Sequence, residues 1–162
     1  MQTMSFNIVS ANLSHSRDIW KWRNDPITRS VSKNTNEVSW EDHDSWFRKS
    51  LTNPYRYLYI GVSATPEDEE PIGIVRFDIS SSSPEYSEVS INIAPQARGK
   101  RFGCLLLKEG TENFAREIKR STRIFAEVKI NNLASIRLFT SSGYSSCDHD
   151  DENYYQYFLD LM

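Results

Sequence analysis

The chain has 162 residues, 38% of them hydrophobic and 12% aromatic, and its formal net charge at pH 7 is −3. These values are typical of a single globular domain over residues 1–162 and exclude a chain that is disordered throughout. The acidic balance argues against a nucleic-acid partner, and the lack of a long apolar run or a signal-peptide pattern argues against a membrane partner and predicts a cytoplasmic protein, monomeric or homodimeric.

The N-terminal third predicts one strand followed by two helices. Residues 6–9 have the spacing of a strand, and a helix is expected from about Ser16 to Arg23. Asp25-Pro26 ends that helix because proline disfavours helical backbone in the residue before it, and the polar residues 28–38 predict a loop. A second helix is expected from Ser39 to about Lys49. Its aromatic face comprises Trp40, His43, Trp46 and Phe47.

The middle of the chain predicts three consecutive strands. Residues 57–62 and 72–79 are apolar strands joined by the polar hairpin loop 66–71. Residues 88–94 form a third strand, in which apolar and polar side chains alternate. Because successive side chains point to opposite faces of a strand, Glu88 lies on the face opposite the apolar residues.

The third strand leads into a glycine loop, Gln96-Ala97-Arg98-Gly99-Lys100-Arg101-Phe102-Gly103, at the start of an apolar-periodic helix. A helix start exposes unpaired backbone N–H groups, glycines let a ligand approach the backbone, and the basic side chains add positive charge. This pattern predicts a pyrophosphate site, with a basic turn capped by glycines as the alternative. The loop lacks the ending of a Walker loop and the third glycine of a dinucleotide fingerprint.

The C-terminal third predicts two helices and three strands. The first helix carries an apolar stripe from Phe102 to Ile118, and a short second helix over residues 133–142 ends at Gly143. The strands are expected at residues 123–128, 144–148 and 154–161. The order of elements predicts an α/β fold with a mixed, mostly antiparallel sheet.

Two of these segments resemble the motifs of the GNAT superfamily of N-acetyltransferases. The segment from Gln96 to Arg101 resembles the acyl-CoA loop, Gln/Arg-x-x-Gly-x-Gly/Ala, and departs from it at Arg101. The segment from Asn131 to Tyr144 resembles the second motif, in which an Asn precedes a short helix and a Gly-aromatic pair. The resemblance implies the GNAT fold with splayed fourth and fifth strands, acetyl-CoA as co-substrate, and transfer of the acetyl group to a small-molecule primary amine.

The resemblance also implies a set of cofactor contacts. The backbone of the third strand of the middle segment would pair with the pantetheine arm, and an N–H near Ile93 would polarise the acetyl carbonyl. Asn132 would contact the pantetheine, although its position equally suits a helix N-cap. For Arg101, we expect a helix-start φ that tolerates any residue. The predicted cofactor-binding residues are Ile91, Asn92, Ile93, Gln96, Arg98, Gly99, Lys100, Arg101, Phe102, Gly103, Asn132, Ser135 and Phe139.

Glu88 is the predicted catalytic residue, because a carboxylate near the acceptor can take the proton of the attacking amine. A solvated glutamate at a strand edge is the alternative, and Glu127 and His43 are reserve bases. Phe139 stands where many family members have a proton-donating tyrosine, so no general acid is assigned.

The acceptor side also carries a resemblance. Trp22-Arg23-Asn24-Asp25 and the segment around His43 are similar to GNAT enzymes that acetylate nucleotide-linked amino sugars, and to ribosomal-protein N-terminal acetyltransferases. Arg23 would meet a substrate phosphate or form a structural ion pair. The predicted acceptor residues are Trp22, Arg23, Asn24, His43 and Glu127.

Phe139 and Arg101 also motivate a different hypothesis, a non-catalytic acyl-CoA-binding module. The polar run 148–152 predicts a solvated turn, and no metal is expected.

Overall fold

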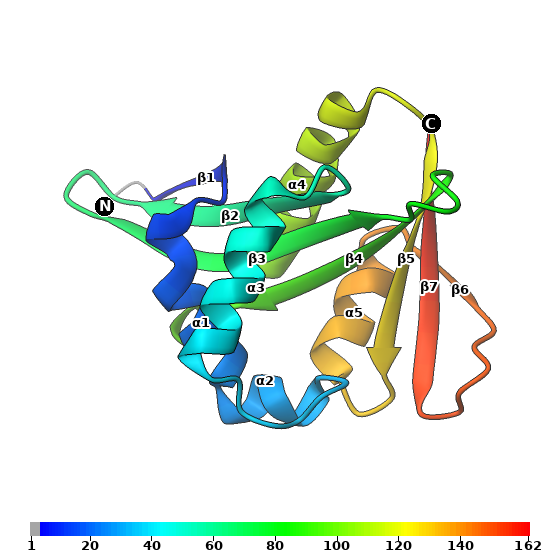
Figure 1. The fold of residues 1–162 in the computed structure, drawn as a ribbon, viewed down its shortest axis with the longest axis horizontal. Coiled ribbons are helices and arrows are strands. Elements are labelled where there is room, and N and C mark those ends of the chain that lie inside the picture. The colour runs from blue at the N-terminus through cyan, green and yellow to red at the C-terminus, as the bar shows by residue number, and fades with distance from the viewer. Residues whose placement is uncertain (1–3) are drawn as a thin grey trace.

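One seven-stranded sheet, in the order β1-β2-β3-β4-β5-β7-β6, organises the computed structural model, which describes residues 4–162 (Figure 1). The strands are β1 (Ser5–Ser10), β2 (Arg56–Ala64), β3 (Glu69–Ile79), β4 (Tyr86–Ile93), β5 (Thr122–Lys129), β6 (Ser145–Cys147) and β7 (Tyr154–Leu161). Neighbouring strands pair antiparallel except β4 and β5, which pair parallel. The mixed, mostly antiparallel sheet predicted from the sequence is therefore confirmed.

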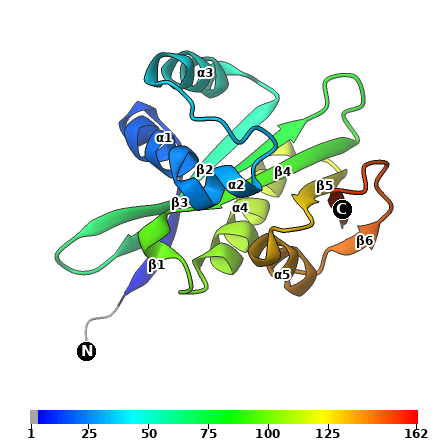
Figure 2. The ribbon, with the colours of Figure 1, turned by 90° about the horizontal axis from the view of Figure 1, so that it is seen from below.

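Helices cover both faces of this sheet. The helices are α1 (Ser16–Asn24), α2 (Pro26–Val31), α3 (Trp40–Thr52), α4 (Phe102–Ile118) and α5 (Leu133–Ser141), with short 3-10 turns η1 (Leu13–His15) and η2 (Pro95–Ala97). Figure 2 shows α1, α2 and α3 on one side of the sheet and α4 and α5 on the other. The sheet therefore forms a central layer between two layers of helices.

The predicted loop over residues 28–38 is wrong in its first part, because α2 occupies residues 26–31. Asp25 Oδ2 accepts hydrogen bonds from the backbone N–H groups of Ile27 and Thr28, at 3.1 and 3.2 Å. Pro26 stands at the first turn of α2, where its missing N–H costs nothing. Asp25-Pro26 therefore ends α1, as predicted, and also begins a new helix.

The β2–β3 hairpin is longer than predicted, because residues 69–71 of the expected hairpin loop belong to β3. Pro71 pairs with Val62, where the register of the two strands shifts at a bulge between Gly61 and Val62. Proline lacks an N–H to donate, and a bulge is one of the places where a sheet tolerates it. The turn itself is limited to the residues between Ala64 and Glu69.

Two hydrophobic clusters, one on each face of the sheet, form the core. The cluster under α4 and α5 contains the fully buried Phe77, Leu106 and Phe114, and the Phe77 and Phe114 rings stack with centroids 4.5 Å apart. The cluster under α1 and α3 contains Trp22 and Phe47. Leu106 and Phe114 of the apolar stripe predicted for the long helix therefore lie against the sheet, whereas Leu105, predicted in the same stripe, is 40% exposed.

Gly110 sets the distance between α4 and the sheet. A Cβ atom at this position would lie 2.5 Å from Val75 Cγ1, closer than atoms can approach without a shift of the buried side chain. We expect Gly110→Ala to lower the free energy of unfolding by about 1–3 kcal/mol, the usual cost of overpacking a core, in urea unfolding. Gly103→Ala is the matched control, because the nearest atom to its Cβ lies 3.6 Å away and alanine favours helix. Equal effects of the two substitutions would contradict this account.

The parallel pairing of β4 and β5 is short, and this shapes the site. Within residues 4–162, it covers Tyr86 with Arg123, Ser87 with Ile124 and Glu88 with Phe125. β4 continues to pair with β3 as far as Ile93. The two strands therefore separate after Glu88, and the splayed fourth and fifth strands expected from the resemblance are confirmed.

Candidate active site

The opening between β4 and β5 exposes backbone that can bind a ligand. Ile91, Asn92 and Ile93 lie beyond the last β4–β5 pair but remain paired with β3 on their other side. Their N–H and C=O groups on the β5 side are thus left for another extended chain, as at a sheet edge. These are the residues predicted to hold a pantetheine arm, and that prediction is compatible with their position.

The glycine loop follows the open end of β4. Gly99 has a φ of +74°, and a Cβ added to it would meet nothing within 4 Å, so open space lies in front of this residue. Arg101, directly before α4, has a φ of +65°. The expectation of a helix-start φ at Arg101 is therefore wrong: the residue occupies the left-handed region, where the small residue of the family motif would be less strained.

The side chains of the glycine loop point in different directions. Arg98 is directed toward α2, where its Nη1 lies 3.0 Å from Asp25 Oδ2 and its Nη2 donates to Thr28 Oγ1 at 2.8 Å. Gln96 Nε2 donates to Glu70 Oε1 at 3.0 Å. Lys100 and Arg101 are exposed. The backbone of the loop and these two exposed cations have no side-chain partner within residues 4–162, and contact of the loop, Arg98 included, with a pyrophosphate stays a prediction.

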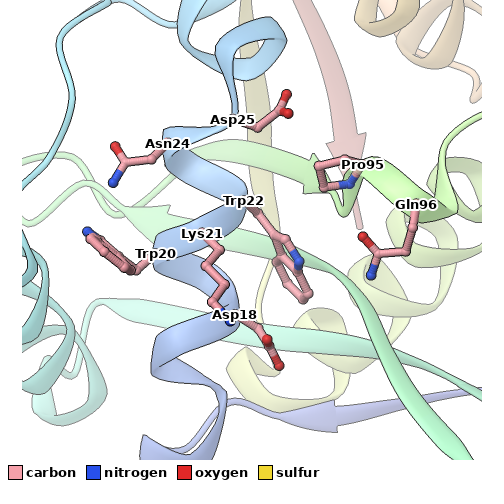
Figure 3. Close-up of a pocket in the computed structure, with 8 residues that line it drawn as sticks. All are labelled: Asp18, Trp20, Lys21, Trp22, Asn24, Asp25, Pro95 and Gln96. Carbon is pink, nitrogen blue, oxygen red and sulfur yellow. The ribbon is translucent and has the colours of Figure 1, made fainter.

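A shallow pocket lies beside the glycine loop, on the outer side of α1 (Figure 3). It has a volume of about 550 Å³ and is lined by Asp18, Trp20, Lys21, Trp22, Asn24, Asp25, Pro95 and Gln96. Trp22, predicted on the acceptor side, is only 4% exposed and packs in the core under α1. Its indole therefore contributes to the fold, and the pocket reaches only its edge.

The second predicted motif lies at the start of α5. The Asn132 side chain accepts from the Ser135 N–H at 3.2 Å, which confirms the N-cap role. Phe139 is 3% exposed and packs against Tyr144 and Tyr157. Gly143 ends the helix with a φ of +85°, as expected. Contact of Asn132, Ser135 and Phe139 with a cofactor stays a prediction.

A cavity of about 510 Å³ lies between α1, α3 and the α3-side face of β3 and β4, and it is called the acceptor cavity below because the predicted acceptor residues Arg23 and His43 line it. Its lining residues are Ile19, Arg23, Asn34, Glu37, Val38, Asp42, His43, Trp46, Ile74, Arg76, Ser90 and Asn92. Glu88 lies two residues before Ser90, on the same face of β4. Ser90 and Asn92 therefore line the cavity beyond the last β4–β5 pair, and Glu88 lies outside its lining on the same face of β4.

Arg23 places a buried donor at this cavity. Its Nη2 donates to the Asn34 carbonyl at 2.7 Å, whereas its Nη1 is buried and has no hydrogen-bond partner among the described residues. A buried guanidinium nitrogen without a partner costs free energy unless a ligand satisfies it. Arg23 is thus prepared to bind an anion or an acceptor oxygen that enters the cavity.

The roof loop, residues 32–39, closes the cavity from above. The Asn24 amide holds it, because Nδ2 donates to the Val38 carbonyl at 2.9 Å and Oδ1 accepts from the Val38 N–H at 2.8 Å. His43 is 3% exposed, and its Nε2 lies 3.1 Å from Ser16 Oγ. Burial lowers the pKa of His43, so the ring is neutral near pH 7. His43 therefore lines the cavity directly, whereas Asn24 lies outside its lining and holds the lining residue Val38 in place.

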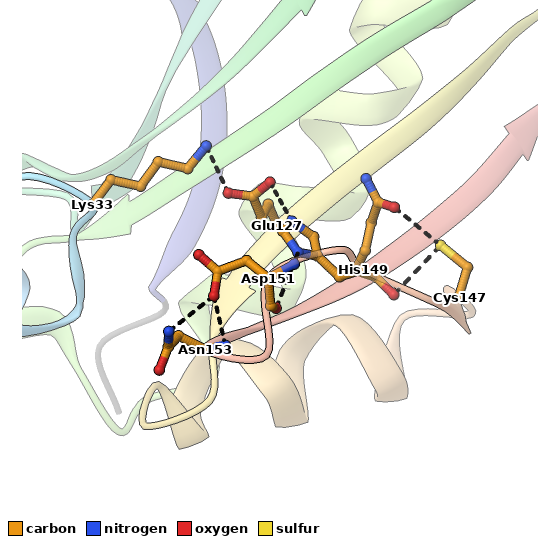
Figure 4. Close-up of polar contacts among 7 residues, drawn as sticks. Lys33, Glu127, Cys147, His149, Asp151 and Asn153 are labelled. Carbon is orange, nitrogen blue, oxygen red and sulfur yellow. Dashed lines mark hydrogen bonds and ion pairs between the residues drawn. The ribbon is translucent and has the colours of Figure 1, made fainter.

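Glu127 lies on β5 between Lys33 and His149 in a chain of polar contacts (Figure 4). Its Oε1 is 2.7 Å from Lys33 Nζ, on the roof loop, and its Oε2 is 2.7 Å from His149 Nε2, on the β6–β7 connection. Burial opposes ionisation, but the bonds to Lys33 and His149 outweigh it and hold the pKa of Glu127 below its usual value. The Asp151 N–H donates to His149 Nδ1 at 2.8 Å, so in the neutral ring Nε2 carries the proton.

Several site residues were missed by the sequence reasoning. Lys33 fell in a predicted loop, His149 in a predicted solvated turn, and Trp46 on a face assigned to the core. Trp46 lines the cavity, whereas Phe47 is fully buried. The charged residues of the roof loop and of the β6–β7 connection were the only sequence feature that pointed to these positions. No local pattern indicated that the two segments meet on β5.

Among residues 4–162, no group of three or more His, Cys, Asp or Glu side chains is arranged to hold a metal ion. In the same part of the chain, every helix is too short or too polar to cross a membrane.

Comparison with known proteins places the fold. A family model described as "Acetyltransferase (GNAT) domain" matches residues 7–145. No curated protein shows significant sequence similarity to the chain.

Solved structures share the whole architecture at low sequence identity. A domain from Methanocaldococcus jannaschii is 21% identical with a TM-score of 0.83, covering 98% of this chain and 100% of its own. Spermidine N-acetyltransferase from Vibrio cholerae, in complex with CoA and spermine, is 15% identical with a TM-score of 0.80, covering 96% and 94%. The protein yncA from Salmonella typhimurium, solved with its cofactor acetyl-CoA, is 19% identical with a TM-score of 0.72, covering 96% and 92%.

Proposed function

This chain belongs to the acetyltransferase (GNAT) domain family of acetyl-CoA-dependent N-acetyltransferases, and from that premise we propose that its acceptor is a primary amine on a phosphate-bearing small molecule, of the nucleotide-linked amino sugar class. The observation that carries the proposal is Arg23, whose buried Nη1 lacks a partner at the acceptor cavity. A phosphate oxygen would satisfy that donor with a charge-assisted hydrogen bond.

The cofactor side supports binding of acetyl-CoA between β4 and β5. The free backbone edge at Ile91–Ile93 suits the amide groups of pantetheine, and the open space before Gly99 suits a pyrophosphate that approaches the backbone. This arrangement holds an activated thioester beside the acceptor cavity, and such positioning supplies much of the rate enhancement of a two-substrate reaction. A backbone N–H near Ile93 is the proposed donor to the carbonyl oxygen.

Glu88 is the proposed base. The side chain is exposed and, within residues 4–162, forms no hydrogen bond or ion pair, so its carboxylate is available to take a proton. It lies at the last paired position of β4, where the opening begins. The neutral amine attacks the thioester carbon, the C–S bond breaks, and the leaving thiolate takes a proton from solvent, because the Phe139 ring has none to give.

The acceptor cavity combines cationic and aromatic groups. Arg76 lies on the cavity wall with its guanidinium carbon 5.7 Å from the Trp46 ring centroid, and Arg23 lies on the opposite side, on α1. Cationic donors beside an aromatic wall suit a nucleotide diphosphate and its base. Glu37 and Asp42 line the same cavity and favour a cationic acceptor such as a polyamine as the second candidate.

Initial rates with UDP-linked amino sugars, short N-terminal peptides and spermidine test this choice. We expect UDP-linked amino sugars to react fastest, and Arg23→Gln to lower kcat/KM for them by about tenfold to a hundredfold, the loss expected for one hydrogen bond to a charged group. Arg48→Gln is the control, because Arg48 pairs with Asp44 on the exposed side of α3.

Different outcomes would replace the proposal. Faster reaction of peptides, with Arg23→Gln leaving the sugar rate unchanged, would favour a protein N-terminal acetyltransferase. Preference for spermidine would assign the cavity to polyamines. Binding of acetyl-CoA with no turnover on any amine would favour a non-catalytic acyl-CoA-binding module.

A further inference from the structure

Lys33 brings a primary amine of the chain itself to the mouth of the acetyl-transfer site. Its side chain extends from the roof loop to β5, where its Nζ lies 2.7 Å from Glu127 Oε1 (Figure 4). The ion pair with Glu127 holds the end of the Lys33 side chain, whereas 61% of the side chain is exposed to solvent. An ammonium group of the chain thus lies on β5, just beyond the point where β5 separates from β4.

Two carboxylates act on this ammonium. Glu127 on β5 contacts it directly, and the charge of Glu88 on β4 also helps to raise its pKa. Glu88 and Glu127 both lie on the face of the sheet covered by α1 and α3, Glu88 at the last β4–β5 pair and Glu127 two residues beyond that pair on β5. The contact with Glu127 therefore places the Lys33 ammonium beside the opening between β4 and β5.

We propose that Lys33 is a self-acetylation site, at which the chain transfers an acetyl group from its own acetyl-CoA to its own side chain. The inference rests on the proposed function, because it uses the same thioester in the same opening. The neutral Nζ attacks the thioester carbon, the C–S bond breaks, and the amine proton passes through Glu127 or Glu88 to solvent and the thiolate. The products are Nε-acetyl-Lys33 and CoA.

Acetylation would change the site, because it removes the charge that holds the roof loop to β5. Within residues 4–162, the ion pair with Glu127 is the polar side-chain contact that joins residues 32–39 to β5. The other polar contacts of the roof loop run to α1, α2 and the start of α3, and they include those of Arg23, Asn24, Arg29 and Ser39. Glu127 would keep His149 as its partner after the reaction.

The rate of self-acetylation should depend on pH in a defined direction. The hydrogen bond to Glu127 raises the pKa of Lys33, and burial only partly offsets this. A raised pKa leaves less neutral amine near pH 7, so self-acetylation should be slower than acceptor turnover and should speed up as the pH rises. His149, on the other oxygen of Glu127, has its pKa raised by the same carboxylate.

The test is intact-mass and peptide mass spectrometry of the protein incubated with acetyl-CoA and no acceptor. We expect one acetyl group on Lys33, formed at least about tenfold faster than in urea-unfolded protein, with a rate constant independent of protein concentration. Lys33→Arg should abolish the adduct, and Lys49→Arg, at the exposed end of α3, should leave it unchanged.

Glu127→Gln separates a directed reaction from a spontaneous one. Without the carboxylate, the pKa of Lys33 falls and spontaneous acetylation should become faster, whereas acetylation in the site should become slower because the amine is no longer held. Faster labelling of Glu127→Gln, or labelling of Lys33 no faster than of other lysines, would overturn the inference. Acceptor turnover without any Lys33 adduct would also overturn it and leave the proposed function intact, while loss of acetyl-CoA binding and turnover would remove both.

Discussion

Glu88→Gln is expected to lower kcat by about a hundredfold at neutral pH, within the usual range for the loss of a general base. The substitution keeps the size of the side chain and removes its ability to accept a proton. The exposed Glu88 forms no polar side-chain contact within residues 4–162, so its loss should leave the fold and the affinity for acetyl-CoA unchanged. Steady-state kinetics over a range of pH, together with calorimetry of acetyl-CoA binding, measure both effects.

Two other glutamates make this experiment selective. Glu85→Gln is the matched control, because Glu85 is also exposed but precedes the paired part of β4 and β5. Glu127→Gln tests the reserve base, whose carboxylate already accepts from Lys33 and His149. Near-full activity of Glu88→Gln with an unchanged pH profile, and a large loss in Glu127→Gln, would transfer the role to Glu127.

Gly99→Val is expected to weaken acetyl-CoA binding by about tenfold or more, corresponding to about 1.4 kcal/mol or more of binding free energy. Gly99 has a φ of +74° and open space in front of it, so a valine there would be strained and its methyl groups would fill the space proposed for the pyrophosphate. Isothermal titration calorimetry of the folded variant measures the change.

Gly143→Val is the control that distinguishes loss of acetyl-CoA affinity through a blocked site from loss through backbone strain. Gly143 has a φ of +85° and also has no atom within 4 Å of an added Cβ, but it lies at the end of α5. Both variants should lose stability through strain, and Gly99→Val alone should lose most of its affinity. Equal affinities in the two variants would move the pyrophosphate away from the glycine loop.

The strained Arg101 is a further point at which this chain departs from its family pattern. Its φ of +65° imposes on an arginine the conformation that a glycine adopts at little cost. The family motif identified Arg101 as an unusual residue at its position, but the residue type alone did not reveal the backbone conformation of Arg101. Only the connection between η2 and α4 shows that the chain must turn there through the left-handed region.

Local sequence patterns predicted most of the helices and strands. The alternation of β4, the aromatic face of α3, the Asn132 cap and the Gly143 stop each follow from a residue's own conformational preferences and those of its near neighbours. The main local error, α2, arose because Asp25-Pro26 can both end and begin a helix. The resemblance of two segments to the family motifs then implied the opening between β4 and β5, and the structure confirms it.

The acceptor side depended on contacts between segments far apart in the chain. Lys33, Glu127 and His149 come from the roof loop, β5 and the β6–β7 connection, and they meet because the packing of the helices and the strand order bring these connections to one place. Arg98 likewise pairs with Asp25, the N-cap of α2, a contact that the glycine-loop pattern did not indicate. Charged side chains are long and solvated in the unfolded chain, so their partners are chosen by three-dimensional proximity and burial, which no local pattern encodes.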